Sequence, residues 1–152
     1  MSHFTGHPQT YQQRVGIGHV PSYQISGIPF ATASFTVPVL GSAPLKIDFP
    51  QVTKFVTVVN TVSGTNVPLR VGFSALGTTG SATPAGGSDN FFTLDNGDSY
   101  TGEWRVQSIF VLSATGSQAS ASIIAGLTGV PFGSVPGTIA GTLNWSGSVG
   151  VG

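Results

Sequence analysis

The chain contains no cysteine and few charged residues, and both absences narrow its function. Of 152 residues, 7% are charged, and five basic residues balance five acidic ones; a typical soluble domain carries about 25% charged residues. The lack of cysteine excludes disulfide scaffolds, thiolate zinc sites and cysteine nucleophiles. Because the chain is neutral and its Lys and Arg are not clustered, we expect no nucleic-acid partner and no binding to an anionic membrane surface.

Long apolar runs and a leader pattern are also missing. No stretch of about 18 apolar residues occurs, so we expect no membrane insertion. The uncharged segment 120–143 is interrupted by Pro131, Pro136 and several glycines. The first eight residues lack a basic region followed by an apolar one, so we expect no signal peptide.

Residues that favour helices are scarce, whereas residues that favour strands and turns are abundant. The chain has one Glu, two Lys and eight Leu, against 17 Val, 17 Thr and 18 Ser, with 22 Gly and 10 Pro. Val and Thr lose rotamer freedom in a helix and fit a pleated sheet. The composition therefore predicts an all-β fold with many turns.

Short apolar segments bounded by turn residues recur along the chain. The candidate strands are residues 22–28, 33–40, 44–49, 52–61, 67–74, 90–94, 99–114, 118–128 and 138–145. With no helix between them, these segments favour antiparallel pairing. We predict an antiparallel β-sandwich, jelly-roll-like, of 8–9 short strands, with a closed barrel as the alternative.

The apolar residues follow two different patterns within these segments. Residues 45–49 and 69–73 alternate between apolar and polar side chains, which indicates strands with one buried face. Residues 104–112 and 56–59 are apolar on both faces. Such strands are expected to lie in the middle of a sheet or under another element.

Several tight turns are predicted between these strands. Residues 95–98, Asp-Asn-Gly-Asp, suit a type I′ hairpin turn, and residues 64–66 and 114–117 resemble further hairpin turns. Residues 76–88 are rich in Gly, Thr, Ser and Ala and predict a surface loop whose only apolar anchor is Leu76. We divide the chain into an extended N-terminal arm (1–21), a single β-sandwich domain (22–145) and a Gly/Ser-rich C-terminal tail (146–152).

Charge is absent from two long stretches of the sequence. No charged residue occurs between Arg14 and Lys46 or after Arg105. One interpretation is a neutral surface of Ser, Thr and Asn; the favoured one is that these segments lie in protein–protein interfaces, where charged residues are depleted. The candidate interface residues are Phe4, Tyr11, Val20, Tyr23, Phe132 and Trp145.

Metal sites have few candidates. The carboxylates and amide of Asp95, Asn96 and Asp98 are oxygen ligands of the kind that calcium takes, but the spacing of an EF-hand is missing. Turn formation is the favoured interpretation of these residues. His3, His7 and His19 could ligate a metal, although Gly6 and Pro8 argue against the helix that would bring His3 and His7 together, and we expect no metal.

Catalytic patterns are equally sparse. The chain has neither a Gly-x-Ser-x-Gly elbow nor a phosphate-binding loop, and its histidines all lie in the arm. Arg70 and Arg105 are expected to pair with acids such as Glu103 or Asp95. We expect neither an enzyme nor a cofactor.

A carbohydrate-binding, lectin-like module is the alternative function. Tyr100, Trp104 and Trp145 could present aromatic platforms on a β scaffold. Trp104, however, would lie on the same face of the expected strand as Val106 and Phe110, which indicates a place in the core. The alternative depends on whether the tryptophans are exposed.

Three stretches between residues 90 and 129 resemble a group of virion proteins. They are residues 90–99 (NFFTLDNGDS), residues 103–113 with Glu-Trp-Arg-Val and Ile-Phe-Val-Leu-Ser, and residues 120–129 (SASIIAGLTG). Together they are similar to small β-rich minor capsid, decoration or cement proteins of icosahedral double-stranded DNA viruses and phages. The resemblance spans roughly residues 52–131.

This resemblance implies a non-enzymatic structural protein located in the virion and synthesised in a host cell. It implies a jelly-roll or sandwich fold and homo-oligomers, with a trimer favoured. The implied partners are the major capsid protein or other virion proteins, with terminal arms that reach neighbouring subunits.

Overall fold

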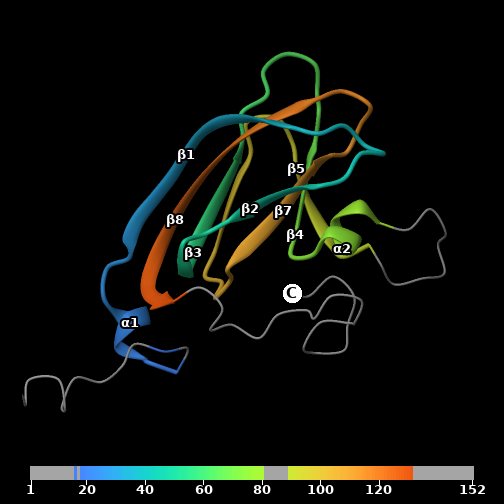
Figure 1. The fold of residues 1–152 in the computed structure, drawn as a ribbon. Coiled ribbons are helices and arrows are strands. Elements are labelled where there is room, and N and C mark those ends of the chain that lie inside the picture. The colour runs from blue at the N-terminus through green and yellow to red at the C-terminus, as the bar shows by residue number, and fades with distance from the viewer. Residues whose placement is uncertain (1–15, 17, 81–88, 132–152) are drawn as a thin grey trace, which may run out of the picture.

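The computed structural model describes residues 16, 18–80 and 89–131, which form eight strands and two short helices (Figure 1). The strands make two four-stranded sheets in which every paired neighbour is antiparallel. The prediction of an all-β antiparallel sandwich is confirmed. The ninth candidate strand, 138–145, lies outside the described residues.

Each sheet combines strands from both halves of the sequence. The first sheet has the order β1 (Ile28–Val37), β8 (Ala119–Pro131), β3 (Gln51–Asn60) and β6 (Ser99–Gly102). The second sheet has the order β2 (Leu45–Asp48), β7 (Ser108–Ser113), β4 (Leu69–Gly72) and β5 (Phe91–Leu94).

The strand pairs are nested about the middle of the chain. β1 pairs with β8, β2 with β7, β3 with β6, and β4 with β5. Two further pairs, β3 with β8 and β4 with β7, complete the sheets. Within the described ranges, β4 and β5 are therefore the one consecutive pair of strands that shares a sheet.

This nesting corrects the prediction of three hairpin turns. Residues 64–66, 95–98 and 114–117 each connect a strand of one sheet to a strand of the other. The predicted type I′ turn is also wrong, because Gly97 has a φ of 80° whereas no described non-glycine residue has a positive φ. A hydrogen bond from Asp98 N to Asp95 O closes this turn, so only its third residue needs the left-handed region.

The segment 99–114, expected to form one strand with room for a bend or bulge, is two strands in different sheets. β6 ends at Gly102 and β7 begins at Ser108. Between them the chain crosses from the first sheet to the second, and Trp104 turns back onto Gly102, where an added Cβ would lie 2.0 Å from the indole ring. Residues 104–112 are apolar on both faces for two reasons: the first of them belong to this crossing segment, and the rest belong to β7, which is central in its sheet.

Two segments that we expected to be strand and loop are helical. Helix α1 (Pro21–Gln24) replaces the first part of the strand expected at 22–28, and its first residue is a proline, which suits the first turn of a helix. Helix α2 (Ala75–Thr79) lies in the expected loop 76–88, and the side chain of Ser74 accepts a hydrogen bond from Gly77 N at its start. Leu76 is 58% exposed and is not an anchor.

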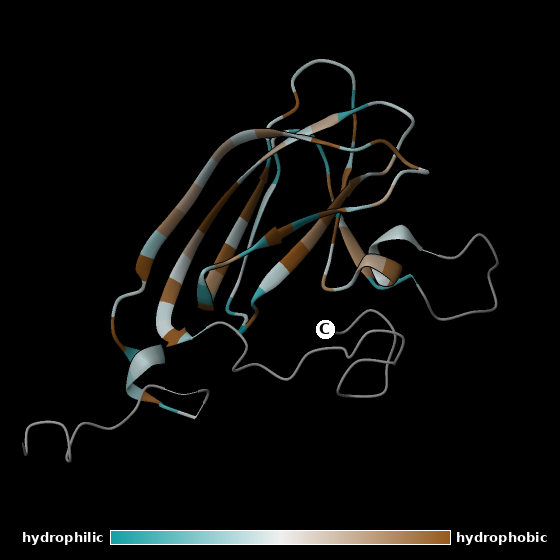
Figure 2. Cartoon of the chain, in the orientation of Figure 1, coloured by the Kyte–Doolittle hydropathy of each residue, from teal (hydrophilic) through white to brown (hydrophobic). Residues whose placement is uncertain are grey.

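The core lies between the two sheets. β3 and β7 each have a neighbouring strand on both sides, which confirms the prediction that both are central. Figure 2 shows hydrophobic residues along both strands. The largest fully buried side chains are Phe49, Leu69, Ile109, Leu112, Ile123, Val37, Val52, Val56, Val58, Val71, Val111 and Val130.

No helix among the described residues is long and apolar enough to cross a lipid bilayer.

Candidate functional site

The outer face of the first sheet carries no charged side chain over most of its length. Along β8, buried residues alternate with outward-facing ones, and the same alternation runs along β3. The four described strands of this sheet contain one charged residue, Lys54, which lies near the start of β3. We call the remaining outward-facing residues the uncharged face; they are Pro29, Ala31, Ser34, Thr36, Phe55, Thr57, Val59, Ser99, Thr101, Ser120, Ser122, Ile124 and Gly126.

Hydroxyl groups on this face bond to one another across the strands. Thr57 Oγ1 and Thr101 Oγ1 are 2.7 Å apart, joining β3 to β6. Thr61 Oγ1 donates to Ser120 Oγ at 2.9 Å. Because these hydroxyls already have protein partners, covering them with another surface breaks fewer bonds to water than covering free hydroxyls would.

The outer face of the second sheet is different in character. Lys46 and Asp48 of β2 form an ion pair at 2.8 Å, and both side chains are about half exposed. The guanidinium of Arg70 lies 4.3 Å from the centre of the Phe91 ring and donates to Thr79 O. Helix α2 packs on β4 and β7. This face is therefore charged and partly covered, whereas the uncharged face is open.

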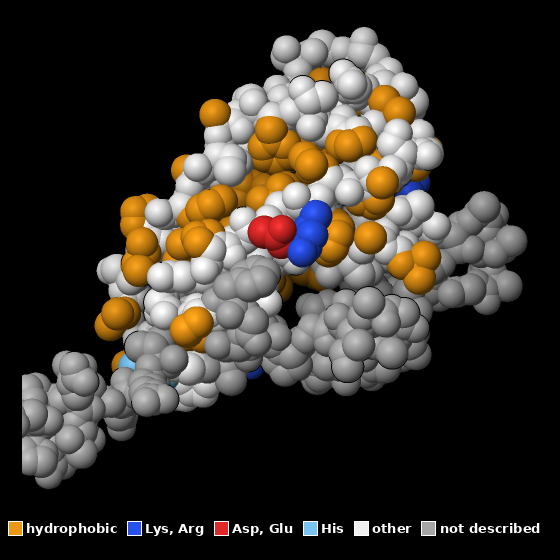
Figure 3. Space-filling model, in the orientation of Figure 1, with side chains coloured by type: hydrophobic (Ala, Val, Ile, Leu, Met, Phe, Trp, Pro, Cys, Tyr) orange, Lys and Arg blue, Asp and Glu red, His pale blue; other side chains and the backbone are white. Residues whose placement is uncertain are grey.

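One edge of the sandwich exposes apolar side chains. β1 and β2 are the edge strands of their sheets on the same side of the molecule, and Figure 3 shows hydrophobic side chains gathered between them. Four partly buried residues pack against the core here: Phe30, Phe35, Leu45 and Ile47. This apolar edge adjoins the uncharged face along β1.

The opposite edge is closed by an aromatic cluster. Trp104 packs against Phe73 at 4.8 Å, Phe92 at 5.9 Å and Tyr100 at 5.7 Å between ring centres. Trp104 also belongs to the partly buried margin of the core, whereas Tyr100 is 50% exposed. The indole is thus held between other rings and is not presented as an open platform, while Trp145 lies outside the described residues.

Gly102 is required by this cluster, and its substitution gives a first prediction. We expect Gly102→Ala to destabilise the fold by about 2 kcal/mol, because the new methyl group would force the packed Trp104 ring to move. Chemical denaturation measures the effect. The matched control is Gly116→Ala, since an added Cβ at Gly116 meets nothing within 4 Å. A Gly102→Ala protein as stable as this control would contradict the prediction.

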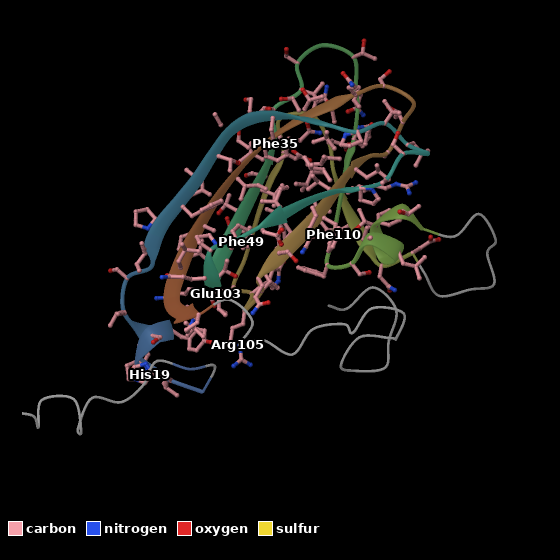
Figure 4. All side chains as sticks on the ribbon, viewed as in Figure 1. His19, Phe35, Phe49, Glu103, Arg105 and Phe110 are labelled. Atoms are coloured by element: carbon pink, nitrogen blue, oxygen red, sulfur yellow. The ribbon has the colours of Figure 1, made fainter. Side chains whose placement is uncertain are left out.

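A pocket with charged walls lies at the end of the sandwich where β3 begins. Its volume is about 330 Å³, and its lining residues are Tyr23, Lys54, Glu103 and Arg105. The Arg105 guanidinium lies 5.6 Å from the centre of the Tyr23 ring, and Lys54 Nζ donates to Ile25 O at 2.7 Å. Figure 4 shows Glu103 and Arg105 at this end of the molecule. We call it the basal pocket.

The basal pocket corrects the prediction that Arg105 pairs with an acid. The ion pair that the described residues form joins Lys46 and Asp48, and none joins the charged groups of the pocket to one another. Arg105 is instead held by an aromatic ring.

One of the suggested calcium ligands, the Asn96 amide, is engaged in other bonds, whereas Asp95 and Asp98 are exposed. Asn96 Oδ1 accepts from Val67 N at 2.9 Å, and Asn96 Nδ2 donates to Thr65 O at 2.9 Å. The amide therefore clamps the β3–β4 loop to the β5–β6 turn. In the described part of the chain, no three His, Asp or Glu side chains are grouped so that they could hold a metal ion.

The structure describes two of the six candidate interface residues. Val20 precedes α1 and is 58% exposed, and Tyr23 lines the basal pocket. Phe4, Tyr11, Phe132 and Trp145 lie outside the described residues, as do His3 and His7. His19 Nδ1 lies 2.6 Å from Ser22 Oγ.

No protein-family model matches the chain, and no curated protein matches it. The argument for function therefore depends on the surfaces themselves. The basal pocket was missed from sequence because Tyr23, Lys54 and Arg105 lie far apart in the chain. The uncharged face was signalled in part, by the charge-free stretches that contain β1 and β8.

Proposed function

We propose that this protein is a structural, non-enzymatic subunit of a virion that stabilises contacts between capsid subunits. The observation that carries the proposal is the uncharged face, which is open and without charge on a protein whose other sheet is charged and partly covered. Interface centres are depleted of charged residues in the same way. The apolar edge beside β1 extends the same surface.

The nested strand pairing supports the finer proposal of a jelly roll. Eight antiparallel strands in two four-stranded sheets, wound as one long folded hairpin, are typical of that fold. Jelly rolls serve in viral capsids and in lectins, so the fold agrees with the proposed role without distinguishing it from carbohydrate binding.

The proposed mechanism is multivalent contact. The uncharged face consists of Ser, Thr, Ala and a few larger apolar groups, so the binding free energy of a single contact is modest. Many such contacts over a lattice add up to a stable assembly. The partners in the proposal are the major capsid protein or further copies of this chain, with a trimer favoured. Residues 1–21 and 146–152 would add contacts to neighbouring subunits.

A single charge on the uncharged face provides the test. We expect Ile124→Glu to weaken self-association by at least about tenfold, because an unpaired carboxylate would be buried in the contact. Ile124 is 49% exposed, so the isolated subunit should fold normally. Light scattering on a sizing column measures the mass as a function of concentration.

The matched control is Thr93→Glu, an exposed position on β5 in the second sheet. This control should keep the mass of the parent protein. If the parent protein is a monomer at all concentrations and does not bind capsid proteins, the proposed function is wrong.

A further inference from the structure

Two groups of charged residues lie at opposite ends of the first sheet, and no ion pair joins either group to another described residue. The basal pocket holds Lys54 and Arg105 against one acid, Glu103, so it has an excess of positive charge. The β5–β6 turn holds Asp95 and Asp98, both exposed, with no basic residue between them.

The length of β3 separates these two groups. Lys54 lies near the start of the strand, and Asn60 at its end accepts and donates backbone hydrogen bonds with the turn that holds Asp98. At about 3.3 Å for each residue of a strand, the two ends lie roughly 20 Å apart. No contact within one copy can join them.

We infer that the β5–β6 turn of one copy docks in the basal pocket of a second copy. The carboxylates of Asp95 and Asp98 would face Arg105 and Lys54, whose charges pair with no acid among the described residues. The chemistry that the pocket selects is thus a carboxylate pair on a tight turn, and this chain presents such a pair at its far end.

The turn is well suited to insertion because it is held in one conformation. Asp98 N donates to Asp95 O, and Gly97 N donates to Asn60 O. The amide of Asn96 is bonded on both sides to the neighbouring loop. A turn that is already ordered loses little conformational entropy on docking.

The pocket is preorganised in the same way. Arg105 lies over the Tyr23 ring, and the ammonium of Lys54 is anchored on Ile25 O at the end of α1. Both cations keep donors for an incoming carboxylate, since an ammonium has three and a guanidinium five.

This inference rests on the proposed assembly role. It adds that one of the contacts is made with a second copy of this chain, from the β5–β6 turn of one copy to the basal pocket of the next. Because the pocket and the turn are different surfaces, the contact is head-to-tail, and it closes into a ring or continues as a filament depending on the rotation between copies. The uncharged face remains available for a second, lateral contact.

Charge reversal at each end tests the inference. Arg105→Glu and the double variant Asp95→Lys with Asp98→Lys should each weaken self-association by about fivefold at low salt, the upper end of what loss of an exposed ion pair gives. An equimolar mixture of the two variants should recover association, because each reversed pocket then meets a reversed turn. Light scattering and sedimentation velocity measure both effects.

The matched control exchanges Lys46 and Asp48, which keeps their ion pair and the net charge and should leave association unchanged. Association of the parent protein should also fall as the salt concentration rises from about 0.05 to 0.5 M. If both reversed variants associate like the parent while Ile124→Glu does not, the head-to-tail contact is wrong and the proposed function stands. If the mixture fails to recover association, the pairing of turn and pocket is wrong.

Discussion

Replacing Asn60 with Leu should destabilise the fold by about 4 kcal/mol. Asn60 is fully buried at the end of β3, and its Nδ2 donates to Val67 O and Leu94 O, both at 3.0 Å. Its Oδ1 accepts from Val62 N at 3.1 Å. Leu has a similar size but no polar atoms, so two buried carbonyls and one amide would lose their partner, each at a cost of about 1–3 kcal/mol.

Thermal and urea unfolding measure this loss. In a domain of this size, 1 kcal/mol corresponds to about 2–4 °C in Tm, so the midpoint should fall by roughly 10–15 °C. Thr57→Val is the matched control: it removes one hydrogen bond on the exposed face of the same strand and should change stability by less than about 1 kcal/mol. Equal effects of the two substitutions would contradict the role we give to Asn60.

Truncation of Phe49 to Ala should have a comparable effect, again about 4 kcal/mol. Phe49 is 1% exposed and follows β2, and its ring meets that of Phe30 edge-on at 5.2 Å between centres. Removing a fully buried phenylalanine leaves a cavity in addition to the lost transfer energy. Because Phe30 comes from β1, the truncation would also loosen the contact between the two sheets at the apolar edge.

A double-mutant cycle isolates that contact. Phe30→Ala together with Phe49→Ala should be less destabilising than the sum of the single effects by about 1 kcal/mol, the coupling expected of an edge-to-face aromatic pair. Phe110→Ala provides the control, since this half-buried ring lies on the outer face of the second sheet. A loss of stability from Phe49→Ala no greater than that from Phe110→Ala would contradict the prediction.

The local patterns of the sequence predicted which residues face the core, but not which strands are partners. The alternation in residues 45–49 and 69–73 located β2 and β4, and the two-sided patterns correctly marked β3 and β7 as central. Alternation reports the burial of a strand face and carries no information on its neighbour. The three predicted hairpins were therefore wrong, because their turns join different sheets.

The errors at 22–28 and 99–114 have local causes. Pro21 begins a helical turn, and the apolar residues that follow it resembled a strand by composition alone. In 99–114, apolar residues continue through the segment that crosses between the two sheets, so the pattern suggested one strand with a bend or bulge, whereas the Trp104 ring packs back on Gly102. The basal pocket could not be predicted, since three elements distant in sequence supply Tyr23, Lys54 and Arg105.

The nested pairing of the strands also has a consequence for how the chain acquires its fold. The bond between Ser34 on β1 and Ser122 on β8 joins residues 88 positions apart, and β1 pairs with no strand other than β8 in the described sheets. Such non-local contacts place the protein among slow folders, in the range of milliseconds to seconds. During synthesis, β1 has no sheet partner until residues 119–131 have left the ribosome. The surface proposed for assembly is thus completed by β8, the last strand in the described part of the chain, so a partly made chain would lack that surface.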